Sequence, residues 1–192
     1  MTFIRFTKRP LFAAFAAVAA LAISACGGSE AGNGTDRAFV GDMVPHHSSA
    51  VDMAKVAQQR GEHPEIKTLA NEIIASQSEE IDQMNKAKSA LSEDNVEAEE
   101  LGIPADMMGM DTATLTTAEP FDREFIDMMI PHHQGAIRMA RAELDKGSSD
   151  ELKTLAQNII SAQTNEIKQM NDWRTKWYDG PSPAGGVSAA NS

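Results

Sequence analysis

Hydrophobic residues recur every three or four positions in four long stretches of this chain, with polar residues between them. This spacing is typical of amphipathic α-helices that bury one face. It predicts helices from 36 to about 60, from 64 to about 91, from 122 to about 146, and from about 148 to 178.

The residues between these stretches predict where the helices begin and end. Gly61 and Gly147 follow the first and third stretches and suit helix C-termini, and Pro64 suits the first turn of the second helix. Ser148 and Glu151 stand at capping-box spacing before the fourth helix. Because each pair of helices is joined by only a few residues, each pair should form an antiparallel hairpin.

The second half of the pattern repeats the first. Residues 36–85 align with residues 122–171 at an offset of 86 without a gap, and 24 of the 50 positions are identical. Neither hairpin could bury its apolar face alone. The sequence therefore predicts an all-α fold, a four-helix bundle made of two duplicated antiparallel hairpins.

The organisation along the chain follows from these boundaries. Repeat one covers 36–91 and repeat two covers 121–178, within one domain of residues 36–178. The acidic segment 92–120 between them shows little periodicity, so we expect a crossover loop with at most a short helical turn. Residues 179–192 are rich in glycine, proline and serine and are expected to form a disordered tail.

The N-terminus has the features of a secretory signal. Basic residues precede an apolar run over 11–22 that is too short to span a membrane. Ile23-Ser-Ala-Cys26 resembles a bacterial lipobox, after which cleavage would leave Cys26 lipidated. The alternative is an ordinary signal peptide followed by a free thiol. We expect a signal peptide at 1–25, a flexible tether at 26–35 and a lipid-anchored protein in the cell envelope, outside the cytoplasm.

The charge of the chain limits its partners. The formal net charge is −11, and it becomes −14 without residues 1–25, which carry three basic residues and no acids. An acidic surface repels phosphate backbones and attracts cations, so nucleic acid is excluded as a partner and a metal ion is favoured.

The repeated stretch that carries candidate chemistry contains four of the five histidines. Each copy has methionine, proline, a His-His pair and a second methionine, at spacings that place methionine and imidazole on one inward face of a helix. The candidate metal ligands on these two helices are Met43, His46, His47 and Met53 in repeat one, and Met128, Met129, His132, His133 and Met139 in repeat two.

The partner helix of each hairpin adds further candidates. Counting back from the two glycines brings Gln77, Glu80 and Met84, or Gln163, Glu166 and Met170, opposite the histidines. We include Met84 and Met170 among the ligands and treat Glu80 and Glu166 as secondary ones.

Several of these residues have a structural alternative. Histidines on an apolar stripe can be hydrogen-bonded core residues, and methionines at helical spacing can simply fill the core. Pro45 and Pro131 either interrupt the backbone hydrogen bonds of a continuous helix or mark where the helix begins. His63, beside Pro64 in a turn, is expected at the surface. Three methionines of the crossover loop, where packing does not explain them, are secondary metal candidates: Met107, Met108 and Met110.

This ligand chemistry favours copper. Thioether and imidazole without thiolate suit Cu(I), and imidazole also accommodates Cu(II). Zinc prefers cysteine or more histidines, and a di-iron site needs Glu-x-x-His elements that the sequence lacks. Repeat two has Met128 at the position where repeat one has Asp42. Because a thioether suits Cu(I) better than a carboxylate does, we expect repeat two to bind copper more tightly.

The stretch Met129-Ile-Pro-His-His-Gln-Gly-Ala-Ile-Arg-Met139-Ala, with Phe-Asp-Arg-Glu-Phe before it, resembles the family called domain of unknown function 305. The resemblance covers nearly all of 36–178 and implies a ferritin-like bundle outside the cytoplasm, copper binding and copper resistance. It carries over to Met129, His132, His133 and Met139, and through the repeat to the first copy. That copy departs from the motif at Asp42, Ser48 and Ser49.

We therefore expect a metal-binding protein that sequesters or delivers copper without turnover. One alternative is a metal-dependent oxidase that acts on Cu(I), with Glu80 or Glu166 in proton transfer. The chain shows no nucleophile and base constellation that would support other catalysis. The other alternative is an envelope protein that binds a protein partner through its helices and needs no metal.

Overall fold

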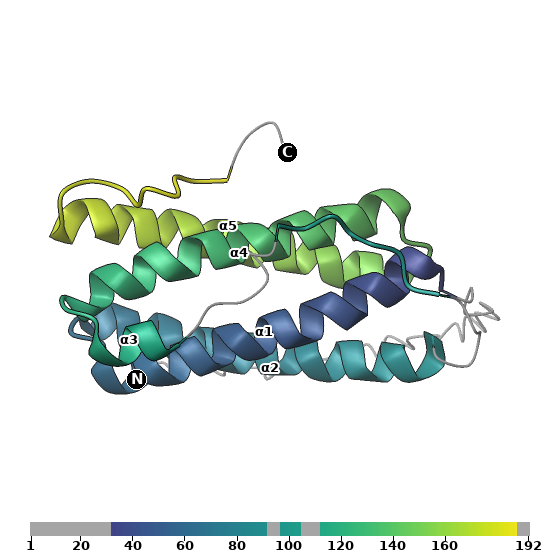
Figure 1. The fold of residues 1–192 in the computed structure, drawn as a ribbon, viewed down its shortest axis with the longest axis horizontal. Coiled ribbons are helices and arrows are strands. Elements are labelled where there is room, and N and C mark those ends of the chain that lie inside the picture. Colours follow the sequence, from purple (N-terminus) through teal and green to yellow (C-terminus); the bar gives the residue numbers. More distant parts are fainter. Residues whose placement is uncertain (1–31, 92–96, 105–111, 188–192) are drawn as a thin grey trace, which may run out of the picture.

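The computed structural model describes residues 32–91, 97–104 and 112–187, which form four long helices and one short helix (Figure 1). The predicted all-α fold with two helical hairpins is confirmed. The helices are α1 (Gly34–Arg60), α2 (Pro64–Leu91), α3 (Ala113–Thr117), α4 (Phe121–Lys146) and α5 (Asp150–Trp177).

The two hairpins meet along their first helices. α1 packs along α2 and α4 packs along α5, while α1 and α4 run antiparallel and join the hairpins (Figure 1). α2 and α5 make few contacts with each other. The helices that carry the two His-His pairs are therefore the inner pair of the bundle.

The first helix begins earlier than the pattern predicted. The Asn33 side chain accepts hydrogen bonds from the backbone N–H groups of Thr35 and Asp36, and the Asp36 carboxylate accepts one from the Asn33 N–H. This capping box starts the helix at Gly34. Residues 33–35 of the expected tether thus take part in the start of α1, and residues 26–31 lie outside the described part.

The start of the last helix also differs from the prediction. Ser149, and not Ser148, is the N-cap of α5, and its hydroxyl accepts a hydrogen bond from the Leu152 N–H. Ser148 instead donates through both its N–H and its hydroxyl to Asp36 of α1. The serine at capping-box spacing is therefore used to join two helices that are distant in sequence.

Gly61 and Gly147 end α1 and α4 as predicted, but not through a left-handed backbone. Their φ angles are −47° and −61°, and their N–H groups donate to Ala57 O and Glu143 O. A Cβ at Gly147 would overlap the Glu143 carboxylate, and one at Gly61 would overlap the Ala57 carbonyl. Close approach, and not a positive φ, requires glycine here.

Both prolines lie inside continuous helices. α1 runs through Pro45 and α4 runs through Pro131, which settles the alternative that the sequence left open. Each proline lacks the N–H that would bond to the carbonyl four residues earlier, at Gly41 or Asp127. The missing hydrogen bond lies directly before the His-His pair in each repeat.

The C-terminal segment is ordered as far as the structure describes it, which corrects the expected tail for residues 180–187. It returns along α4 and α5, where Gln134 donates to Ala184 O and Gly186 O, and Asn171 donates to Gly185 O. Ala184 and Val187 pack against the core.

In the described residues, no helix has the length and apolarity needed to cross a bilayer. The expected signal peptide and Cys26 lie outside these residues.

Candidate functional site

The first histidine of each repeat meets its counterpart at the centre of the bundle. The imidazole rings of His46 and His132 have centroids 3.7 Å apart and an interplanar angle of 32°. Both side chains are buried, at 1% and 0% relative exposure. Since α1 and α4 are antiparallel, the repeat places these two equivalent residues opposite each other.

The second histidine of each repeat turns to its own hairpin. His47 Nε2 lies 2.7 Å from Glu80 Oε2 on α2, and His133 Nε2 lies 2.6 Å from Glu166 Oε2 on α5. The carboxylates that the sequence placed opposite the histidines are thus their hydrogen-bond partners. Because each Glu holds Nε2, the other ring nitrogen, Nδ1, is the one left for a ligand, and neither Nδ1 has a hydrogen-bond partner in the described structure.

His132 has the most unusual environment of the four. Burial and the neighbouring His46, His133 and His47 hold its pKa well below its usual value, while the His46 backbone acts weakly in the opposite direction. Neither of its ring nitrogens makes a hydrogen bond of ordinary geometry within the described residues. A buried imidazole that stays neutral and keeps its nitrogens free has the form in which histidine binds metals.

The six core methionines are fully buried and lie in two separate clusters. One contains Met53 from repeat one with Met129 and Met170 from repeat two. The other contains Met43 and Met84 from repeat one with Met139 from repeat two.

Each of these two core clusters therefore combines methionines of both repeats, whereas the sequence pattern grouped the candidate ligands by repeat. In antiparallel helices, a residue before the histidines of α1 comes near residues after the histidines of α4. Met43 thus joins Met139 and not Met53, which lies nearly three helical turns away on the same helix. Glutamines near these clusters, Gln77 and Gln163, are also buried, and their side-chain oxygens have no hydrogen-bond partner in the described structure.

One of the remaining candidate ligands is described by the structure, and three are not. Met128 is only partly buried and packs against the outside of the cluster that contains Met129. Met107, Met108 and Met110 lie outside the described residues. Among the described residues, no group of three or more histidine, cysteine or acidic side chains is arranged to hold a metal. A metal in this layer would thus require thioether ligands as well as imidazole.

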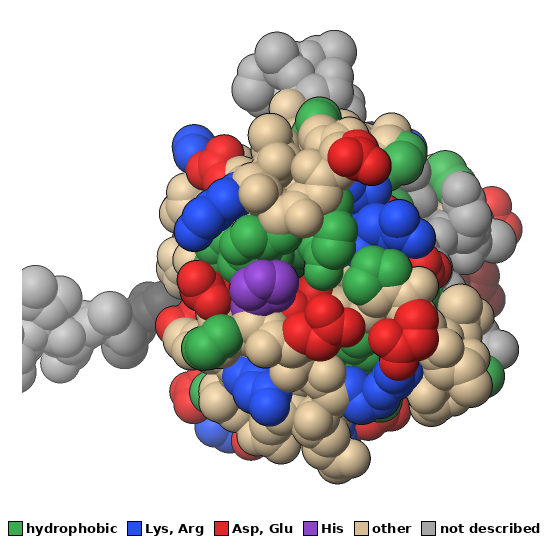
Figure 2. Space-filling model, turned by 90° about the vertical axis from the view of Figure 1, so that its left-hand side faces the viewer, with side chains coloured by type: hydrophobic (Ala, Val, Ile, Leu, Met, Phe, Trp, Pro, Cys, Tyr) green, Lys and Arg blue, Asp and Glu red, His purple; other side chains and the backbone are tan. Residues whose placement is uncertain are grey.

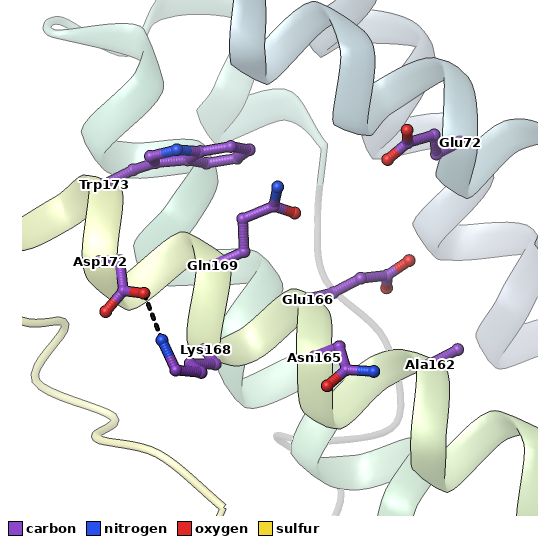
Figure 3. Close-up of a pocket in the computed structure, with 8 residues that line it drawn as sticks. All are labelled: Glu72, Ala162, Asn165, Glu166, Lys168, Gln169, Asp172 and Trp173. Carbon is purple, nitrogen blue, oxygen red and sulfur yellow. Dashed lines mark hydrogen bonds and ion pairs between the residues drawn. The ribbon is translucent and has the colours of Figure 1, made fainter.

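A groove between α2 and α5 leads from the surface to one of the histidine partners (Figure 3). It encloses about 510 Å³ and is lined from α2 by Glu72 and from α5 by residues that include Glu166, Gln169 and Trp173. Figure 3 shows the side chains of Glu72, Glu166 and Gln169 directed into the space between the two helices. Glu166, bonded to His133, thus connects the groove with the buried layer.

Two aspartates, which sequence reasoning did not single out, hold the ends of the bundle through hydrogen bonds to their carboxylates. Asp36 of α1 accepts hydrogen bonds from Ser148 and Ser149 at the turn before α5. Its repeat counterpart, Asp122 of α4, accepts them from Glu62 N and His63 N before α2. The sequence signal that could have revealed this role is the aspartate at the first position of each repeat. Each repeat therefore caps the second helix of the other.

His63 keeps part of its side chain at the surface, where it was expected, and it also has a structural role in this arrangement. Its Nδ1 lies 2.7 Å from Asp122 Oδ2, and its ring stacks on Trp177 with centroids 3.8 Å apart. At this end of the molecule a histidine lies among hydrophobic and acidic side chains (Figure 2). The fifth histidine thus secures the bundle end, away from the other four.

The fold and this layer define a class of protein: a duplicated helical bundle whose centre holds histidines between clusters of methionines. The chain belongs to the family described as Domain of unknown function (DUF305), whose model matches residues 36–174.

Solved structures with this fold include CopM. Its Cu(II)-bound form is 43% identical, covers 74% of this chain and 97% of its own, and has a TM-score of 0.67. The Cu(I)-bound form has 42% identity with the same coverage and a TM-score of 0.65, and Ag-bound forms are also similar. A secreted DUF305 protein from Streptomyces coelicolor has 24% identity, coverage of 74% and 92%, and a TM-score of 0.66, which shows the shared fold.

A viral relative matches over a shorter range. Uncharacterized protein L153 of Acanthamoeba polyphaga mimivirus is 46% identical over 50 residues, which are 26% of this chain and 33% of that protein. The match thus spans about a third of the length of this curated relative.

Proposed function

We propose that this protein binds copper, with Cu(I) as the preferred ion, in a single layer shared by the two repeats. The observation that carries the proposal is the His46 and His132 pair, buried between two methionine clusters. The two rings are in contact, with centroids 3.7 Å apart, so one metal ion bound at this place would have both imidazoles within reach. The metal-bound forms of CopM support the same assignment.

The donor types explain the preference for Cu(I). Thioethers bind soft ions, and all six core methionines are sealed from water. Imidazole adds a ligand that can accept Cu(I) or Cu(II). The Glu80 and Glu166 carboxylates orient His47 and His133, the role that acidic partners of metal-binding histidines commonly have.

A competition titration of Cu(I) against a chromogenic chelator tests this proposal. His46→Ala and His132→Ala should each weaken binding by at least about tenfold, and by similar factors, because each removes half of one pair. His63→Gln is the matched control, since it removes a histidine outside the layer. Equal affinities in all four proteins would remove the histidines from the site. A much larger loss for His132→Ala would instead favour separate sites, with repeat two the tighter.

We further propose that the protein sequesters or delivers copper and does not turn it over. The burial of the histidine and methionine donors supports this, because a buried ion is shielded from other reactants. Oxygen consumption after addition of Cu(I) distinguishes this from the oxidase alternative. Stoichiometric binding without oxygen uptake is expected, and sustained uptake that is lost in Glu166→Gln would establish an oxidase.

The cellular location belongs to the same proposal. The lipobox-like Ile23-Ser-Ala-Cys26 supports a lipid anchor in the cell envelope, which would place the acidic domain where external copper arrives. Cys26→Ser should move the protein from the membrane fraction to the soluble fraction. If the variant fractionates as the wild type does, the anchor is not at Cys26.

A further inference from the structure

The ligands of the proposed copper layer are closed to solvent. The four histidines and six methionines of the layer have relative exposures of 0% or 1%. Two acidic side chains that touch these histidines reach the surface: Glu80, which contacts His47 and has 15% of its side chain exposed, and Glu166, which contacts His133 and has 17% exposed. Each of these carboxylates offers an ion a way from the surface to the layer.

The groove lies beside the carboxylate of repeat two. Glu166 lines the groove between α2 and α5, and Glu80 is not part of its lining. A second hollow of about 220 Å³ shares Glu72, Gln169 and Trp173 with the groove and extends it along α2 towards Pro64. On the repeat-two side, the described residues thus form an open groove that reaches a histidine partner.

The chemistry of the groove suits passage more than storage. Glu72 and Glu166 face each other across it and Gln169 adds an amide, while Lys168 is paired with Asp172 at 2.5 Å on the outer side (Figure 3). Carboxylates raise the local concentration of cations. They bind Cu(I) more weakly than thioether and imidazole do, so a Cu(I) ion in the groove would be bound more strongly once it reached the core.

We propose that the α2–α5 groove is the route by which the metal ion enters the layer, with Glu72 collecting it and Glu166 passing it to His133. This inference rests on the proposed function, since it assigns a path to the same ion. Glu166 is both a groove residue and the hydrogen-bond partner of His133, so an ion at Glu166 is already in contact with the layer.

The repeat provides a matched pair of variants. Ala162 lines the groove, and its counterpart Ser76, at the equivalent exposed position of α2, does not. Ala162→Phe should fill the groove and slow loading of Cu(I) or Ag(I) by about tenfold in stopped-flow measurements, with an unchanged equilibrium affinity. Ser76→Phe should load at the wild-type rate.

A charge variant tests the collecting role separately. Glu72→Gln should slow loading by about threefold at low salt, and this difference should shrink as salt is added. Glu79→Gln, which removes the same charge from an exposed site outside the groove, should have a smaller effect. Glu72 and Glu79 make no contact with the proposed ligands, so the affinity should persist in both variants.

The outcomes separate this inference from the function on which it rests. Slower loading only in the groove variants, at equal affinity, supports the route. Equal rates in Ala162→Phe and Ser76→Phe, whether both normal or both slowed, overturn it while leaving metal binding intact. If the wild-type protein binds neither Cu(I) nor Ag(I), the proposed function fails and the route fails with it.

Discussion

Glu143 is an acid buried beside another acid. Its side chain has no solvent exposure, and burial together with the neighbouring Asp36 raises its pKa from the usual 4.5 to about 8. The pKa of Asp36 is instead lowered, because hydrogen bonds from Glu143, Asn33, Ser149 and Ser148 together outweigh its burial. One proton therefore stays on Glu143 while Asp36 remains charged and holds the turn before α5.

This pair predicts a pH dependence of stability. Because the folded state binds a proton at Glu143 that the unfolded state releases above pH 4.5, its stabilisation is complete below about 4.5 and is lost as the pH rises to about 8. Asp36 has the opposite sign, and its contribution is lost only as the pH falls below its usual 3.8. The two windows do not overlap.

Urea unfolding of the metal-free protein at pH 5, 6.5 and 8 measures this effect. The wild type should lose on the order of 3 kcal/mol relative to Glu143→Gln between the lowest and highest pH, since the glutamine does not titrate. Glu151→Gln, at an exposed position nearby, should follow the wild type. Parallel curves for the wild type and Glu143→Gln would show that Glu143 ionises normally.

Sequence alone predicted which residues face the core but not which residues meet. Helical spacing placed the histidines and methionines on inward faces, and the turn glycines placed Glu80 and Glu166 opposite the histidines. The contact between His46 and His132 depends on the register of α1 against α4, which no local pattern encodes. The same register decides that Met43 joins Met139. The partner of His63 was missed for this reason as well.

At the level of elements, α1 and α4 each keep a proline inside a continuous helix. Both prolines precede the His-His pair by one residue, and both interrupt the hydrogen-bond ladder where the helix approaches the buried layer. A proline in a helix interior costs about 3 kcal/mol. The duplicated cost indicates that the backbone before the histidines contributes to the site.

Replacing the exposed Pro45 with alanine should therefore raise the stability of the metal-free protein by about 1–3 kcal/mol, because the new N–H can bond to the Gly41 carbonyl. Pro64→Ala is the control, since proline is tolerated in the first helical turn and no gain is expected. Thermal unfolding monitored by circular dichroism measures both. A loss of stability in Pro45→Ala would show that the ring itself packs favourably.

The extent of the helices was well predicted because its signals are local. The predicted and observed limits of α1, α2 and α4 differ by at most two residues, and glycine, proline and capping residues account for this. The N-cap of α5 and the ordered segment 180–187 were missed because distant residues fix them: Asp36 holds Ser148, and Gln134 and Asn171 hold the returning chain. Composition alone indicated disorder there.

For the whole molecule, the buried apolar residues of both hairpins should be enough to fold the chain without metal. The two core clusters include phenylalanine, isoleucine and leucine from both repeats, and each buried side chain of this size contributes roughly 1.5–3 kcal/mol. A metal ion should add stability to a fold that already exists.

Circular dichroism of the metal-free protein should thus show a largely helical chain with a cooperative thermal transition. Addition of Cu(I) at about 100 times its dissociation constant should raise the unfolding free energy by about 2.7 kcal/mol and shift the transition upward. A metal-free chain that is largely unfolded and becomes helical only on addition of copper would contradict this prediction.

The interleaving of the two repeats has a consequence for how such a protein can arise and change. A single hairpin holds one histidine of the central pair and only part of each methionine cluster, so it could form this layer only as a symmetric dimer. Fusion of two copies makes the association intramolecular, and the site then no longer depends on protein concentration. It also frees the halves to diverge, which identical subunits cannot do. The two repeats differ in this way at several of the positions discussed above: Ala162 against Ser76, Trp173 against Ala87, and Glu143 against Ala57. The two sides of the bundle can therefore have different roles.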